Sequence, residues 1–134
     1  MLRFLIVDDD EDDRELFCDA VGIVDPSINC IIARNGEEAL AGLRNHKLER
    51  PDIIFLDLNM PRLNGKQCLI ALKKDLALQN IPVVIFTTSK LKEDKAETKL
   101  LGACDFVSKP TAQKELCDTI SRILAKYGAL IQTK

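Results

Sequence analysis

The stretch Ile53-Ile54-Phe55-Leu56-Asp57 carries the clearest fold signal in the chain, because four apolar residues run without interruption into one carboxylate. A continuous apolar run of this length is typical of a strand buried on both faces of a parallel sheet. Similar short runs, rich in Val, Ile and Phe, recur along the chain at Phe4–Val7, Ile28–Ala33, Pro82–Phe86 and, more weakly, Cys104–Val107. The sequence therefore predicts five buried strands.

Amphipathic stretches lie between and after these runs. The clearest apolar stripe at helical spacing consists of Leu116, Ile120, Ile123, Leu124 and Tyr127, whereas the stretch 90–101 carries the sparsest one. Helix starts are indicated by Asn35 with Glu38 three residues later, and by Thr111 after Pro110. Five strand-then-helix units predict an α/β fold with a parallel sheet, right-handed crossovers and helices on both faces.

Composition bounds the class of protein. The 134 residues, 46% hydrophobic and 30% charged, suit one globular domain, with a core at about 2–127 and a short tail at 128–134. The formal charge of -2 argues against direct nucleic-acid binding, and no apolar run reaches the roughly 20 residues that span a bilayer. Five cysteines, an odd number with no CxxC pair, indicate reduced thiols in a cytoplasmic protein.

Polar residues follow the predicted strands at their carboxyl ends. The acidic run Asp8–Asp13 follows the first strand, Asp57 the third, Thr87 lies at the end of the fourth, and Lys109 follows the fifth. Ligands bind beyond the carboxyl ends of strands in open parallel sheets, so these groups are expected to share one rim. Each of these features alone is weak evidence for a functional site. An acidic run, for example, is usually a solvated face or a favourable helix start. Their coincidence at matching strand ends indicates a site.

This set of side chains suits one kind of chemistry. Clustered carboxylates repel one another, and a divalent cation relieves that repulsion. Oxygen ligands without a nearby Cys or His favour Mg²⁺, with Mn²⁺ as an alternative. A carboxylate beside such an ion can attack phosphorus and form an aspartyl phosphate. Phosphoryl transfer needs mainly charge neutralisation, which the metal and the Lys109 ammonium would supply.

The chain resembles the receiver domains of response regulators in two-component systems over nearly its whole length. The resemblance rests on Phe4-Leu5-Ile6-Val7-Asp8-Asp9, on Phe55-Leu56-Asp57-Leu58-Asn59-Met60-Pro61 with Asn64-Gly65, on Pro82-Val83-Val84-Ile85-Phe86-Thr87, and on Gly102-Ala103 leading to Lys109-Pro110. It implies a single-domain, chemotaxis-regulator-like protein. The implied fold is the flavodoxin-like, doubly wound (βα)5 arrangement with strand order 2-1-3-4-5.

The resemblance also implies roles for the acidic residues and their neighbours. Asp57 would accept a phosphoryl group from a sensor histidine kinase. The metal would be held by Asp8, Asp9, Asp57 and the backbone carbonyl of Asn59. Asn59 and Ser89 would flank the path of attacking water, so their substitution would change the lifetime of the phosphoryl group without preventing phosphorylation.

A second group of residues would read the phosphoryl group. The resemblance implies that Thr87, Thr88 and Lys109 bind it, and that Thr87 and Phe106 form the conformational switch. Departures from the commonest pattern are the extra Asp10 after the acidic pair, Phe106 where Tyr is frequent, and Thr111 where an aromatic residue is frequent. Without a hydroxyl, Phe106 could switch only through burial of its ring.

Output is expected through a protein partner at the face of the fourth helix, fifth strand and fifth helix, because no DNA-binding or enzymatic domain follows the last stripe. A phosphorelay step and self-association as a homodimer stay open, and no activity on other substrates is expected. A small Mg²⁺-dependent phosphatase with an Asp nucleophile is disfavoured, since Asn59 stands where its second Asp would be. A flavin or nucleotide module is disfavoured because no Gly-rich loop follows Val7. His46 is expected to be an exposed surface residue.

Overall fold

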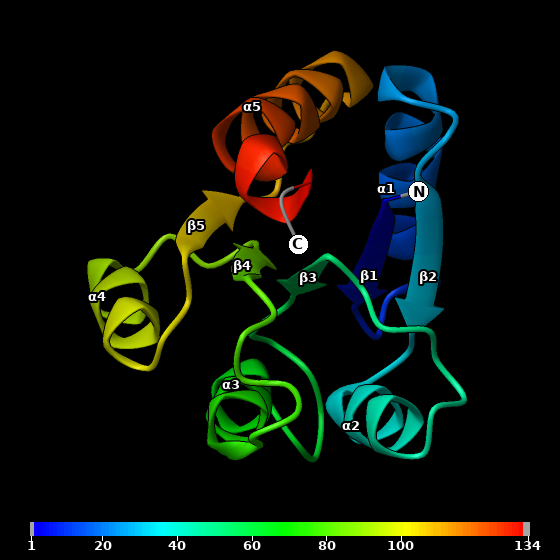
Figure 1. Ribbon diagram of the computed structural model, residues 1–134. Coiled ribbons are helices and arrows are strands. Elements are labelled where there is room, and N and C mark those ends of the chain that lie inside the picture. Colours follow the sequence, from blue (N-terminus) through cyan, green and yellow to red (C-terminus); the bar gives the residue numbers. More distant parts are fainter. Residues whose placement is uncertain (1, 133–134) are drawn as a thin grey trace.

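The computed structural model describes residues 2–132 and contains one parallel five-stranded sheet, with strand order β2-β1-β3-β4-β5 (Figure 1). The strands are β1 (Arg3–Val7), β2 (Asn29–Ala33), β3 (Ile53–Leu56), β4 (Val83–Thr87) and β5 (Asp105–Ser108). Both the parallel sheet and its order are confirmed. The five apolar runs of the sequence coincide with the strands to within about one residue at each end.

Five helices cover the sheet: α1 (Glu11–Val24), α2 (Gly36–Arg44), α3 (Gly65–Lys74), α4 (Lys92–Leu100) and α5 (Gln113–Gln132). Helices α1 and α5 pack on one face, α2 and α3 lie on the other, and α4 lies beside β5 at the edge of the sheet (Figure 1). Among the residues of α4 only Thr98 is buried, which agrees with its sparse apolar stripe. No helix of residues 2–132 is long and apolar enough to cross a membrane.

Two apolar layers hold these helices in place. Under α1 and α5, the rings of Phe4, Phe17, Phe55 and Phe86 pack together, and the Phe17 and Phe55 ring centroids lie 4.7 Å apart. Under α2 and α3, the layer is mainly aliphatic. Because strands β1, β3 and β4 are buried on both faces, their polar residues can emerge only at their ends, and this fixes the site at the carboxyl edge.

Capping side chains set where the helices near that edge begin. Asp10 caps α1 by accepting from the Asp13 backbone N–H, Asn35 caps α2 as predicted, and Asn64 forms a capping box on α3. The sequence predicted Thr111 as the capping residue before the last helix, and this is wrong by one position. Helix α5 begins at Gln113, so Ala112 is the residue before it, and the Ala112 carbonyl accepts from the Leu116 N–H.

The last helix also differs from the prediction at its C-terminal end. A tail was expected from residue 128, but α5 continues to Gln132. A glycine such as Gly128 costs about 1 kcal/mol relative to alanine inside a helix, which weakens the helix without ending it. The predicted tail residues 133–134 lie outside the described part of the chain.

Candidate functional site

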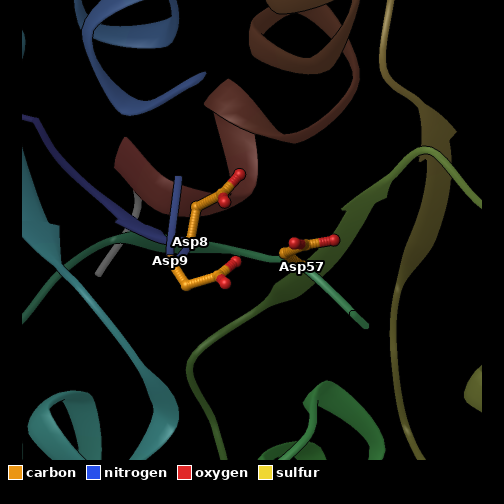
Figure 2. Close-up of side chains that lie close together, drawn as sticks. All are labelled: Asp8, Asp9 and Asp57. Carbon is orange, nitrogen blue, oxygen red and sulfur yellow. The ribbon is translucent and has the colours of Figure 1, made fainter. Parts of the chain in front are cut away.

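Three carboxylates converge at the carboxyl edge of the sheet. Asp8 and Asp9 follow β1, and Asp57 follows β3, which pairs with β1 in parallel register. One carboxylate oxygen from each residue lies within 4.8 Å of the other two (Figure 2). Asp8 and Asp57 are buried, whereas Asp9 is exposed. The site is therefore open to solvent on the Asp9 side.

Lys109 brings positive charge to this acidic cluster from the loop after β5. Its Nζ lies 2.6 Å from an oxygen of Asp8, 2.8 Å from one of Asp13 and 3.7 Å from one of Asp57. Burial alone would lower the pKa of Lys109, but hydrogen bonds to Asp13 and Asp8 and the charge of Asp57 raise it. The lysine is therefore a fixed cation at any physiological pH, bridging the ends of β1 and β3 and the start of α1.

Two residues of α1 belong to the site and were not singled out from the sequence. Asp13 is the second hydrogen-bond partner of Lys109, and buried Arg14 donates from Nη1 to the backbone carbonyl of Asp8 at 2.9 Å. The sequence showed only an acidic run, in which each carboxylate could equally have been a solvated helix start. The structure separates them, because the Asp10 side chain caps α1 and does not join the cluster of three.

Asp57 is surrounded by hydrogen-bond donors as well as by charge. Its Oδ1 accepts from the backbone N–H of Asn59 at an N–O distance of 3.4 Å, and the hydroxyl of buried Thr87 lowers the pKa of the carboxyl. Burial is the largest influence on the pKa of Asp57 and raises it; Lys109 opposes this shift and Asp8 adds to it. Burial likewise raises the pKa of Asp8. Even beside Lys109, the negative charges of Asp8 and Asp57 are therefore costly, and a further cation at the cluster would relieve that cost.

The raised pKa of Asp57 predicts a pH-dependent stability effect in metal-free buffer. The folded state holds this proton to a higher pH than the unfolded chain, whose carboxyl keeps an ordinary pKa near 3.8, so this group's contribution to stability is full below that pH and is lost as the pH rises. Asp57→Asn should therefore melt at a higher temperature than the wild type at pH 7, and the gap should close toward pH 4. A gap that does not change with pH would contradict this.

Gly65 is the residue that lets the loop after Asp57 close against the sheet. A Cβ at this position would lie 2.2 Å from the backbone oxygen of Asp57 and 2.6 Å from the Cα of Leu58. The Gly65 N–H donates to the Leu58 carbonyl at 3.1 Å, so the first turn of α3 rests directly on the backbone of the proposed acceptor. Both opposing atoms belong to the backbone, which cannot rotate away as a side chain can.

Gly65→Ala is accordingly expected to destabilise the fold by about 2–3 kcal/mol, because a fixed backbone must move to admit the methyl group. Gly22→Ala is the matched control: this glycine is also helical, and nothing lies within 4 Å of its added Cβ. Alanine there should stabilise the protein by about 0.5–1 kcal/mol. Urea unfolding of both variants measures the difference, and equal free energies would overturn the packing argument.

The remaining predicted site residues lie around this centre at different depths. Asn59 and Thr88 are exposed, and Ser89 is half-buried. The Ser89 N–H donates to the Thr87 Oγ1 at 3.3 Å, while its hydroxyl lies 2.5 Å from an Asp94 carboxylate oxygen on α4. Ser89 thus connects Thr87 to α4, because its backbone N–H bonds Thr87 and its hydroxyl bonds Asp94. His46 is exposed, as expected.

Phe106 lies away from the acidic cluster, on β5 under α4. Its side chain is half-buried and packs against the aliphatic layer. It also borders a hollow of about 200 Å³, whose other lining residues are Lys95, Thr98, Lys99, Ala103, Cys104 and Asp105. The hollow gives the ring space on the side of α4. Thr87, at the end of the neighbouring β4, is opposite Ser108 in the β4–β5 register.

Comparison with known proteins agrees with this arrangement. A family model, the response regulator receiver domain, matches residues 4–121. Protein PilH of Pseudomonas aeruginosa is 36% identical over 125 residues, which cover 93% of this chain and 99% of that protein. The Mn²⁺-bound form of the response regulator Rcp1 has a TM-score of 0.82 at 29% identity, over 93% of each chain. The phosphorylated cyanobacterial phytochrome response regulator RcpA has a TM-score of 0.84 at 29% identity, over 92% of this chain and 91% of that one.

Proposed function

Since the chain belongs to the response regulator receiver domain family of two-component signalling, we propose that Asp57 accepts a phosphoryl group from a sensor histidine kinase. The observation that supports this assignment most strongly is the convergence of Lys109, Thr87 and two further carboxylates on Asp57 from the ends of three other strands. Buried titratable groups with a perturbed pKa and specific charged partners cluster at functional sites. The family alone would not identify which residue carries the reaction.

The proposed reaction needs little from the protein beyond position and charge. One oxygen of Asp57 attacks the phosphorus of a phosphohistidine, the new P–O bond forms, and the P–N bond to the donor imidazole breaks. The three phosphoryl oxygens then lie where Lys109 Nζ, the Thr87 hydroxyl and the Asn59 backbone N–H already point at Asp57. These donors neutralise and hold the charge that moves onto the acceptor.

The chemistry of the cluster fits a hard divalent cation. Asp8, Asp9 and Asp57 supply three carboxylate oxygens within one ion's reach, two of them from buried side chains whose pKa values burial raises. Oxygen-only ligands and one solvent-exposed side suit Mg²⁺, which keeps several waters, or Mn²⁺. The Asn59 backbone carbonyl is proposed as a further ligand. When bound, the ion neutralises the carboxylates and the phosphoryl oxygens.

Two neighbouring aspartates provide a matched test of the metal site. Asp9→Asn should weaken Mg²⁺ or Mn²⁺ binding by about 10-fold or more, because it removes a charged ligand a few ångströms from the ion. Asp10→Asn should change binding by less than about threefold, since asparagine caps a helix equally well and Asp10 is not in the cluster. Titration calorimetry with each ion distinguishes the two. Similar losses in both variants would mean that the ion is held elsewhere.

The proposed function is tested by phosphoryl uptake from a small acyl phosphate. The wild-type protein should acquire one phosphoryl group per chain in the presence of Mg²⁺ and far less when the ion is chelated, as intact mass spectrometry would show. Uptake that is equally fast without a divalent cation would contradict the role of the acidic pair. No uptake under either condition would contradict the acceptor function itself.

Signal output is proposed to use the face formed by α4, β5 and α5. This proposal is supported by the loose packing of α4, which buries only Thr98 and borders the hollow beside Phe106. Inward movement of Thr87 toward a phosphoryl group would pull on Ser89, and through Asp94 on α4. This face would then exist in two packing arrangements. A downstream protein that binds the arrangement favoured by the phosphoryl group would shift the equilibrium further toward it.

A phosphorelay step without direct output is the second candidate, because the acceptor site would be identical. Self-association also stays a proposal. A phosphatase acting on other substrates is not supported: Asn59 is exposed at the position where a second carboxylate would be needed, and its backbone N–H faces Asp57. Any turnover is proposed to be limited to the protein's own aspartyl phosphate.

A further inference from the structure

One lysine ties the start of α3 to α4. Lys66 is the second residue of α3, and its Nζ lies 2.7 Å from Oδ1 of Asp94 and 2.8 Å from Oε2 of Glu97, which both belong to α4. Helix α4 buries only Thr98, so it has little apolar packing of its own. These ion pairs are therefore expected to matter more for the position of α4 than surface ion pairs do on a well-packed helix.

The contacts continue from Asp94 toward the acceptor site. The Ser89 hydroxyl donates to Oδ2 of Asp94 at 2.5 Å, and the Ser89 backbone N–H donates to Oγ1 of Thr87 at 3.3 Å. The two oxygens of Asp94 thus bind different partners, Lys66 on one side and Ser89 on the other. Hydrogen bonds from Lys66 and Ser89 lower the pKa of Asp94, so the carboxylate stays charged at neutral pH. An unbroken chain of polar contacts therefore runs from α3 to the end of β4.

Lys66 is the fixed end of this chain, because α3 rests on the backbone of the acceptor. The residue before it is Gly65, where an added Cβ would lie 2.2 Å from the backbone oxygen of Asp57. A pocket of about 260 Å³ lies between the start of α3 and the start of α4, lined by Leu58, Asn59, Met60, Asn64, Lys66 and Asp94. The ion pair thus borders open space, and its strength decides how easily α4 shifts on this side.

We propose that Lys66 and Asp94 are positioning residues, which hold Ser89 and α4 in the arrangement of the unphosphorylated protein and so weaken phosphoryl binding at the acceptor. This role presupposes the proposed function, because the restrained movement is that of Thr87 toward a phosphoryl group. Such a movement changes the contact of Thr87 with the Ser89 N–H, and Asp94, held by Lys66, resists the accompanying shift of Ser89. Release of the restraint must strengthen phosphoryl binding by the factor that the restraint costs.

The test measures the dissociation constant of beryllofluoride, a mimic of the phosphoryl group on a carboxylate, at saturating Mg²⁺ by fluorine NMR. Lys66→Met keeps most of the side-chain length and removes the charge. This variant should bind beryllofluoride about three- to fivefold more tightly than the wild type, as expected for the loss of a partly exposed ion pair. Asp94→Asn should give a similar gain. The double variant should gain little beyond either single one, because each substitution already breaks the same pair.

The signs of these two effects separate the restraint from simple electrostatics. Lys66→Met removes a positive charge, so loss of direct attraction would weaken the binding of an anion, whereas Asp94→Asn removes a negative charge and would strengthen it. The restraint predicts a gain in both variants. Lys92→Met is the matched control: it makes the same charge change at the exposed first residue of α4, outside the chain of contacts, and should change the affinity by less than about 1.5-fold.

Salt provides a further readout that a loss of packing would not move. The difference in affinity between Lys66→Met and the wild type should shrink as NaCl rises from about 0.05 M to about 0.5 M, because salt screens a partly exposed ion pair. Unchanged or weaker binding by Lys66→Met, or opposite shifts in the two single variants, would overturn the restraint and leave the acceptor function intact. A wild type that does not bind beryllofluoride with Mg²⁺ would overturn the proposed function, and the restraint with it.

Discussion

Replacing Asp57 with asparagine is expected to abolish phosphoryl uptake from an acyl phosphate in the presence of Mg²⁺. The amide has nearly the same shape but lacks the nucleophilic carboxylate oxygen, so no acyl phosphate can form at position 57. The fold should survive, because burial raises the pKa of Asp57 and a neutral side chain is therefore tolerated there. Labelled phosphate retained by the protein, measured beside thermal unfolding, tests both statements.

Asp12→Asn provides the matched control for that experiment. Asp12 is an exposed carboxylate in the first turn of α1, four residues from Asp8 in sequence, and it is not part of the cluster. Its replacement makes the same chemical change and the same change in net charge, and uptake should stay near the wild-type level. If Asp57→Asn keeps a substantial share of the label, the acceptor lies elsewhere in the acidic run.

Replacing Lys109 with methionine is the second large effect. The uptake rate should fall by about 10²–10³-fold, because the variant loses a preorganised positive charge at the place where negative charge gathers in the reaction. Methionine keeps most of the length of the side chain, so packing against Phe86, whose ring centroid lies 5.8 Å from Nζ, changes little. Initial rates at saturating Mg²⁺ measure this effect.

Lys126→Met separates the local role of Lys109 from a general loss of charge. Lys126 also pairs with a carboxylate, Asp105 at 3.3 Å, but it is an exposed residue of α5 and lies away from the acceptor. Its substitution should leave the uptake rate within about twofold, as expected for a surface ion pair of small energetic value. A rate for Lys109→Met that matches that of Lys126→Met would remove the lysine from the proposed mechanism.

Much of this arrangement could be predicted because the relevant signals are local in sequence. Each strand shows itself as an apolar run, and each of Asp57, Thr87 and Lys109 lies at or just beyond the end of such a run. The rule for parallel sheets then brings these residues to one edge without any knowledge of side-chain contacts. The order of the strands came from family resemblance, since apolar runs alone do not give it.

What could not be predicted depends on how one element is rotated against another. The sequence gives no reason why Asp13, among the acidic residues of α1, should meet Lys109, or why Arg14 should reach the Asp8 carbonyl. An odd number of cysteines without a short motif pointed only to reduced thiols.

The position of the phosphoryl group is the measurement that tests the central claim most directly. After phosphorylation with an acyl phosphate and Mg²⁺, borohydride reduction converts an aspartyl phosphate into homoserine, and tandem mass spectrometry identifies its place in the chain. The tryptic peptide of residues 48–62 contains both Asp52 and Asp57, so each molecule carries its own internal comparison. We expect homoserine at position 57 alone. Homoserine at Asp8, Asp9 or Asp13, or a phosphoryl group on His46, would contradict the assignment.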